Sequence, residues 1–80
     1  MPYPKPDLTL AIVVRSLREE RGVSREALAA EAGITTGSLA RTELGYAAPS
    51  RDTMQRIAGA LGLPVSGLVA AVETRRRLAA

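Results

Sequence analysis

The chain has 80 residues, enough for one small domain, and contains neither cysteine nor histidine. Disulfide bonds and thiolate metal sites are therefore excluded, and the usual general base and commonest transition-metal ligand are missing. We expect neither an enzyme nor a protein with a metal, cofactor or small-molecule ligand. All basic residues except Lys5 are arginine, and the formal net charge of +3 favours a polyanionic partner.

The longest strongly apolar stretch, residues 8–14, is far shorter than the roughly 20 residues that a bilayer requires. Prolines interrupt the first six residues, and the pattern of a signal peptide is missing. We therefore expect a cytoplasmic protein with no membrane partner. The many arginines and alanines are typical of proteins from GC-rich bacterial genomes.

The start and stop signals along the chain predict five helices and no strand. A capping residue and a glycine bound each of the first four helices. These pairs are Asp7 and Gly22, Ser24 and Gly33, Thr35 and Gly45, and Ser50 and Gly62. Pro64 opens a fifth helix, whose last turn holds Arg75 to Arg77. This run is interpreted as a solvated helix end, with a contact to nucleic acid as the alternative. The sequence thus predicts an all-α, compact five-helix bundle over residues 7–80, preceded by an extended arm at residues 1–6.

One face of each expected helix is apolar at helical spacing, which predicts the core. These faces hold Leu10, Val13, Val14 and Leu17; Leu28, Ala29 and Ala32; Leu39; Met54, Ile57, Ala58 and Leu61; and Val65, Leu68, Val69 and Val72. On the fifth helix, Val69, Val72 and Leu78 exceed what the core needs. Leu8 and Ile12 form a second apolar strip on the first helix. We therefore expect a symmetric homodimer formed through the fifth helix.

Residues 25–44 combine two short helices with a turn at Gly33 and Ile34. Such a short connection makes the helices cross at a steep angle of about 90–120°. Ala29 is small enough for the crossing point, Gly33 permits a positive backbone angle, and Ile34 and Leu39 fill the wedge. The outer face of the helix that follows Thr35 then projects far enough to enter a major groove of DNA.

The chain resembles the helix-turn-helix family of phage repressors and Cro proteins over roughly residues 10–68. The matching residues are Leu17-Arg18 with Arg21-Gly22, Ser24 to Ala29, Gly33-Ile34, Leu39-Ala40-Arg41, Glu43 with Gly45, Pro49-Ser50, and Ala60 to Leu63. The resemblance implies a small dimeric transcriptional regulator that binds a near-palindromic double-stranded DNA operator. Within this family the chain resembles restriction–modification controllers in size. A phage-type repressor and an antitoxin are the alternatives.

Nine residues are candidates for DNA contact: Arg25, Thr35, Thr36, Gly37, Ser38, Arg41, Tyr46, Ser50 and Arg51. The helix that follows Thr35 is the expected recognition helix, the one that enters the major groove. Arg41 projects from it and is suited to guanine or to a phosphate, and residues 36–38 face base edges. Helix N-termini at Arg25 and at residues 50–51 suit phosphate oxygens. Tyr46 either binds a phosphate or packs within its loop.

Three positions depart from the family's usual pattern. Arg25 stands where glutamine is usual, so it either meets a phosphate or braces the recognition helix. Thr42 replaces an apolar residue, and Gly37 replaces a longer polar side chain, which suggests close backbone approach to DNA or a neutral substitution. The resemblance also implies that Arg18 and Glu43 form a partly buried ion pair between the first helix and the recognition helix.

The segment from 24 to 45 is not basic, because three glutamates outnumber Arg25 and Arg41. The imbalance matters less if Arg18 neutralises Glu43 and if Glu26 and Glu31 face away from DNA. It otherwise favours the second interpretation, a protein-interaction adaptor or antitoxin that has the same fold with weak or no DNA binding.

Overall fold

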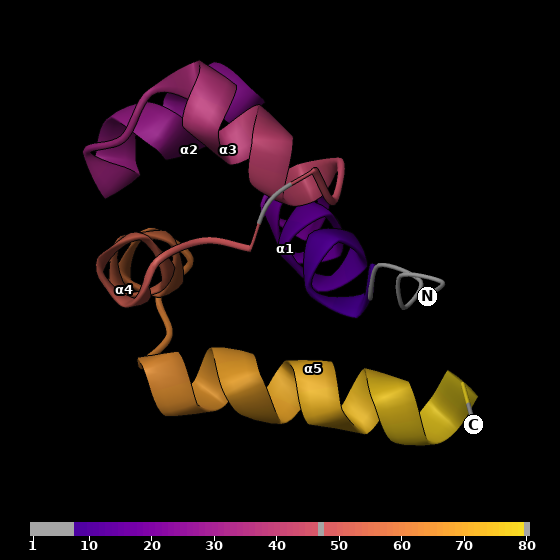
Figure 1. Ribbon diagram of the computed structural model, residues 1–80. Coiled ribbons are helices and arrows are strands. Elements are labelled where there is room, and N and C mark those ends of the chain that lie inside the picture. The colour runs from indigo at the N-terminus through magenta and orange to yellow at the C-terminus, as the bar shows by residue number, and fades with distance from the viewer. Residues whose placement is uncertain (1–7, 47, 80) are drawn as a thin grey trace.

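The computed structural model describes residues 8–46 and 48–79, which form five α-helices and, within those ranges, no strand. The helices are α1 (Thr9–Glu20), α2 (Arg25–Ala32), α3 (Thr36–Glu43), α4 (Arg51–Ala60) and α5 (Val65–Ala79). In Figure 1, α5 lies along one side of the molecule and α2 and α3 lie on the opposite side. Helices α1 and α4 lie between them and contact both sides. The predicted all-α five-helix fold is confirmed.

Three of the predicted helix starts are confirmed by side-chain caps. Ser24, Thr35 and Ser50 each accept a hydrogen bond from the backbone N–H three residues ahead, at 3.1, 3.0 and 3.1 Å. Such caps satisfy amides that have no partner inside the helix. Leu8 occupies the N-cap of α1, and its side chain forms no capping bond. Asp7, the expected cap, and the expected arm at residues 1–6 lie outside the described residues.

The core is apolar and draws on all five helices. It consists of Val13, Val14, Leu28, Ala29, Leu39, Ile57, Ala58, Leu61, Leu68 and Val72. The prediction that Val72 is surplus to the core is wrong: α5 lies closely enough on α1 and α4 to leave only 6% of it exposed. Val69 and Leu78 of the same helix are 45% and 82% exposed, and Leu8 and Ile12 of α1 are also exposed.

The corner between α2 and α3 is packed as the sequence predicts. Gly33 ends α2 with φ of +71°, in the left-handed region that side chains disfavour. Ala29 and Leu39 are almost completely buried on either side of the corner, and Ile34 packs against the same core. This corner fixes where α3 starts, and it leaves one side of α3 free of core contacts.

Among the described residues, no single helix is long and apolar enough to cross a membrane. Only α4 and α5 taken together reach that length and apolar character, and the chain bends by 91° between them.

Candidate nucleic-acid interface

One side of α3 is open to solvent. Gly37 and Arg41 are exposed and Ser38 is partly exposed, whereas Leu39 points into the core. An added Cβ at Gly37 would meet no atom within 4 Å, so nothing inside the protein crowds this position. The side of α3 that holds residues 37, 38 and 41 is therefore displayed on the surface rather than sheltered in the fold.

A groove of about 540 Å³ runs between α3 and the segment that leads into α4. It is lined by Thr35, Gly37, Ser38, Arg41, Thr42, Ala48, Pro49, Ser50 and Thr53. Five of the nine predicted contact residues thus meet at one groove. The other four, Arg25, Thr36, Tyr46 and Arg51, are not among its lining residues.

Four lining residues were not among the predicted contacts: Thr42, Ala48, Pro49 and Thr53. The sequence could have pointed to Thr53, because it is the third residue after the Ser50 cap and so lies beside Ser50 at the start of α4. In the structure the two hydroxyl oxygens are 3.0 Å apart. Thr42 is buried, and its hydroxyl donates to the Ser38 carbonyl at 3.3 Å. That bond explains how α3 tolerates a polar residue at an inward position.

The basic side chains around this groove differ in how they are engaged. Arg41 and Arg51 are exposed, and neither side chain forms a hydrogen bond or ion pair with any residue that the structure describes. Tyr46 is 76% exposed, so its interpretation as a residue packed within the loop is not supported. These three side chains are consequently free to meet a partner in solution.

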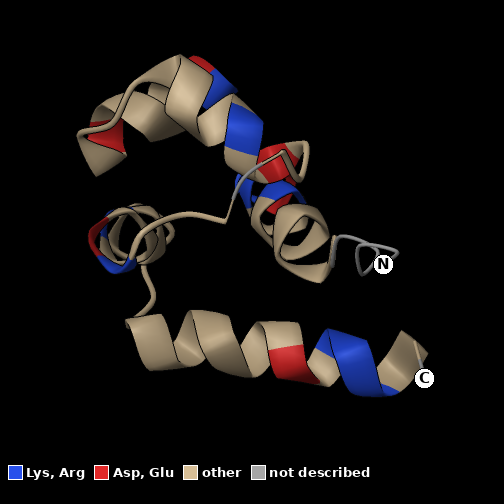
Figure 2. Ribbon diagram, in the orientation of Figure 1, with Lys and Arg blue, Asp and Glu red and all other residues tan. Residues whose placement is uncertain are grey.

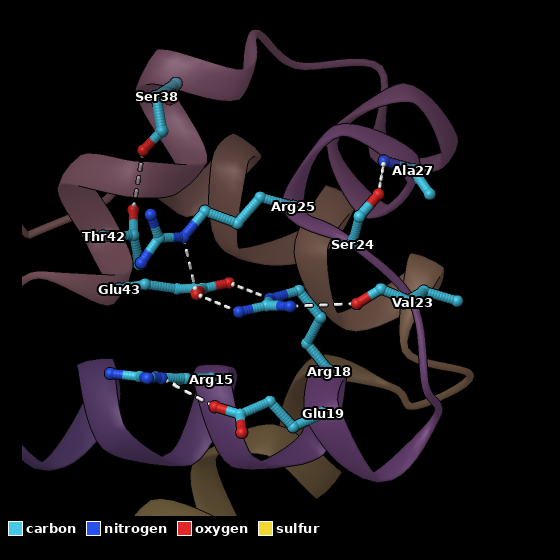
Figure 3. A network of polar contacts seen from close by, with 10 residues as sticks. All are labelled: Arg15, Arg18, Glu19, Val23, Ser24, Arg25, Ala27, Ser38, Thr42 and Glu43. Carbon is cyan, nitrogen blue, oxygen red and sulfur yellow. Dashed lines mark hydrogen bonds and ion pairs between the residues drawn. The ribbon is translucent and has the colours of Figure 1, made fainter.

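Arg25 is engaged by a buried carboxylate, as Figure 3 shows. The side chain of Glu43 is completely buried and accepts bonds from Arg18 Nε at 2.8 Å, Arg18 Nη2 at 3.0 Å and Arg25 Nε at 3.0 Å. Arg18 also donates from Nη1 to the Val23 carbonyl at 2.9 Å. The predicted ion pair between Arg18 and Glu43 is confirmed, and Arg25 braces the recognition helix as one of its two interpretations proposed.

These contacts change the acidity of both partners. Burial is the largest single influence on the pKa of Glu43, and acting alone it would raise that pKa. The hydrogen bonds and positive charges of Arg18 and Arg25 together outweigh burial, so the pKa of Glu43 lies below its usual range. The hydrogen bond to Glu43 raises the pKa of Arg18 above its usual value. The carboxylate is therefore ionised, and its charge is neutralised inside the protein.

The other acids of the helix-turn-helix segment do not line the groove. Glu31 lines a separate hollow between α2 and α4, together with Arg21 and Arg56, and Glu26 is exposed. Figure 2 shows basic residues on α3 and, on the opposite side of the molecule, near the C-terminal end of α5. The run from Arg75 to Arg77 consequently does not lie beside the groove.

Solved structures with a similar fold include a gene regulator. The crystal structure of the clp gene regulator ClgR from Corynebacterium glutamicum has a TM-score of 0.81 and 27% sequence identity, covering 94% of this chain and 82% of that chain. A second crystal structure of ClgR has a TM-score of 0.76 and 25% identity, covering 91% and 95% respectively.

Similar sequences carry related names. The immunity repressor protein of Bacillus phage phi105 is 34% identical over 62 residues, which are 78% of this chain and 43% of the repressor. An uncharacterised helix-turn-helix-type transcriptional regulator of Mycobacterium bovis is 41% identical over 51 residues, 64% of this chain and 20% of that protein. The chain thus spans less than half the length of these two relatives. The helix-turn-helix family model matches residues 14–68, most of the chain, and the chain belongs to this helix-turn-helix family.

Proposed function

We propose that the chain binds double-stranded DNA in a sequence-specific manner as a small transcriptional regulator, with α3 in the major groove. The observation that carries this proposal is the open side of α3, where the exposed, unpaired side chain of Arg41 lines the groove. Membership of the helix-turn-helix family and the names of the similar regulators support it.

Each candidate residue has a proposed task. Arg41 forms a bidentate contact with guanine O6 and N7 or binds a phosphate, and residues 36–38 lie against base edges. Residues 50–51, at the start of α4, meet phosphate oxygens, as does Thr35 at the start of α3. Tyr46 donates its hydroxyl hydrogen to a phosphate.

We further propose that two copies pair through α5. Val69 and Leu78 are exposed on that helix, and Leu8 and Ile12 add an exposed apolar strip on α1. In a dimer that reads two adjacent half-sites, the two α3 helices would lie about 34 Å apart, one turn of DNA. A dimer of this kind reads an approximately palindromic operator and acts as a repressor or a controller.

Selection of duplexes from a random oligonucleotide pool, at two salt concentrations, tests the central proposal. We expect an enriched sequence and an affinity that falls steeply with salt, because each phosphate contact releases a counterion. Failure to enrich any sequence would contradict the proposal and favour the protein-interaction adaptor or antitoxin. The short side chains of residues 36–38 and the exposed Glu26 are the features that favour that second function.

Single substitutions then separate base contacts from phosphate contacts. Arg41→Ala should weaken binding about tenfold or more, because it removes the energy of one bidentate contact, and it should relax the preference at one base pair. Arg51→Ala should weaken binding to all sequences and reduce the salt slope by about one. Arg56→Ala is the matched control, because Arg56 is already paired with Asp52 at 2.8 Å and lines the separate α2–α4 hollow.

Analytical ultracentrifugation tests the dimer. We expect a dimer at micromolar concentration, converted to a monomer by Val69→Glu, because the substitution places a charge within the apolar contact. The same substitution at the exposed Gln55 is the control. A wild-type monomer at micromolar concentration would contradict the proposed pairing.

A further inference from the structure

The two large apolar residues that α5 exposes lie on opposite flanks of that helix. Leu78 follows Val69 after about two and a half turns at 3.6 residues per turn, so the two side chains point in opposite directions around the helix axis. They accordingly line different hollows: Val69 lines one with Leu10 and Met54, and Leu78 lines another between α5 and α1. The flank that holds Leu78 therefore stays open when two copies pair through the flank that holds Val69.

The hollow beside Leu78, here named the α1–α5 groove, is shaped to receive another helix. It has a volume of about 380 Å³, and its apolar walls are formed by Val13 and Leu17 of α1 and by Ala71 and Leu78 of α5. Within each helix these residues are four or seven positions apart, which aligns their side chains in a row along one side. A third helix can lay its own side chains between the two rows. The groove is open to solvent along Leu78, whereas small-molecule sites enclose most of their ligand.

The polar residues of the α1–α5 groove indicate the charge of its occupant. Ser16, Thr74 and Arg75 line the groove, and no acidic residue of the described chain does so. The exposed Arg75 side chain forms no hydrogen bond or ion pair with any residue that the structure describes. Its neighbour Arg76, by contrast, lies on the other flank and pairs with Glu73 at 3.2 Å. The α1–α5 groove thus places an unpaired cation beside an apolar wall, which favours an occupant that is both apolar and acidic.

A second copy of the chain fits the α1–α5 groove poorly. In a symmetric pair each surface faces the same surface of the partner, so two Arg75 side chains would enter one interface. None of the described acidic residues lines the groove to compensate them, and juxtaposed like charges oppose association. The flank that holds Val69 has no such conflict, because Glu73 and Arg76 supply both signs of charge there. The charges therefore favour different partners for the two flanks of α5.

We propose that the α1–α5 groove binds an amphipathic helix of a partner protein, one that carries acidic residues beside its apolar stripe. The stripe packs against Leu17 and Leu78, and an aspartate or glutamate of the partner pairs with Arg75. Figure 2, in the orientation of Figure 1, shows the basic end of α5 on the opposite side of the molecule from α2 and α3. A helix in the groove consequently leaves the open side of α3 free, so this inference does not depend on the proposed DNA binding.

Selection from a displayed library of helical peptides tests the groove without DNA. The peptides have 15 residues, the length of α5, and are randomised along one side of the helix. With the wild-type chain as bait, we expect the enriched peptides to share apolar residues at spacings of three and four, with an acidic residue beside them. Fluorescence anisotropy of a labelled synthetic copy of an enriched peptide then measures its affinity.

A charge exchange tests whether Arg75 meets the acidic residue. Arg75→Glu should weaken binding of the enriched peptide about tenfold or more, and changing the acidic residue of the peptide to lysine should restore binding to this variant. Leu78→Gln should weaken binding as well, because it removes part of the apolar wall. Arg77→Glu is the matched control, since it changes the net charge equally on the same helix and Arg77 does not line the groove. A thermal melt checks that each variant folds.

The proposed partner is overturned if the library yields no enriched peptide, if the enriched peptides lack an acidic residue, or if Arg75→Glu binds them as the wild type does. Analytical ultracentrifugation tests the second copy as the alternative occupant. A dimer that Leu78→Gln converts to a monomer, and that Val69→Glu leaves intact, would assign the groove to a second copy. Failure of the wild-type chain to bind DNA would refute the proposed function and leave the result of the peptide selection unaffected.

Discussion

Arg18 in α1 holds the buried carboxylate of Glu43 at the end of α3 with two hydrogen bonds, although 25 positions separate the two residues. A carboxylate at the C-terminal end of a helix is disfavoured by the helix dipole, so α3 needs a cation at this point. Arg18 supplies it from a different helix. The orientation of α3 is consequently tied to α1 as well as to the corner at Gly33.

Removal of this carboxylate should destabilise the fold strongly. Glu43→Ala leaves Arg18 partly buried without its partner, and breaking a buried pair costs roughly 3–5 kcal/mol. Urea denaturation measures the change in the free energy of unfolding. Glu19→Ala is the control, because its pair with Arg15 is more than half exposed on both sides and such pairs contribute about 1 kcal/mol or less. Equal losses in the two variants would show that the buried pair adds nothing beyond an exposed one.

The same carboxylate should make stability depend on pH in the acidic range. The pKa of Glu43 is lowered on folding, so its contribution is complete above the unfolded pKa of about 4.3 and is lost as pH falls through the lower folded value. Glu43→Gln removes this titration. We expect the difference in unfolding free energy between wild type and Glu43→Gln to be constant near neutral pH and to shrink below about pH 4.3. A difference that grows on acidification would reverse the assigned direction.

Gly37→Ala should stabilise the protein and weaken DNA binding. An alanine Cβ there meets no atom within 4 Å, and alanine is favoured over glycine inside a helix by about 1 kcal/mol. Gly59→Ala in α4 is matched to it, because its Cβ also meets nothing within 4 Å. Both melting temperatures should rise, and only Gly37→Ala should lower the affinity if the backbone of α3 lies against the DNA. Undiminished affinity in Gly37→Ala would identify this glycine as a neutral substitution.

Gly45→Ala should cost more stability than Gly62→Ala. Both glycines have φ of +75°, so the backbone strain is the same in the two variants. A Cβ at Gly45 would collide with the Leu8 side chain, whereas a Cβ at Gly62 meets no atom within 4 Å. The displaced group is the end of a partly exposed side chain, so the extra loss should be modest, and urea denaturation measures the difference between the two variants. Equal losses would mean that Leu8 moves aside freely.

The local features of the fold were predictable from the sequence because they depend on neighbouring residues. The caps at Ser24, Thr35 and Ser50 use a side chain and an amide three residues apart, and spacing alone reveals them. Helical spacing put both Val69 and Val72 on the apolar face of α5, but it could not decide which of them the core would cover. That depends on how α5 lies across α1 and α4, which buries Val72 and leaves Val69 exposed.

The candidate site was predictable to a similar extent. The exposed face of α3 follows from helical periodicity, and the bond between Arg18 and Glu43 followed from the family resemblance. The alanine and proline that complete the groove, at residues 48–49, are placed by the path of the chain between α3 and α4. The bond between Arg25 and Glu43 joins a long side chain of one helix to the end of another, so the sequence left two interpretations open.

The two secured ends of α3 have a practical consequence. The Thr35 cap holds one end, and Glu43 ties the other to α1 and α2, so neither attachment uses the side chains on its open face. Exchanging Gly37, Ser38 or Arg41 for other residues leaves both attachments in place. The side chains on the open face of α3 can therefore be changed without loosening the helix. If the proposed DNA binding holds, substitutions at these few positions would be enough to change the DNA sequence that the protein prefers.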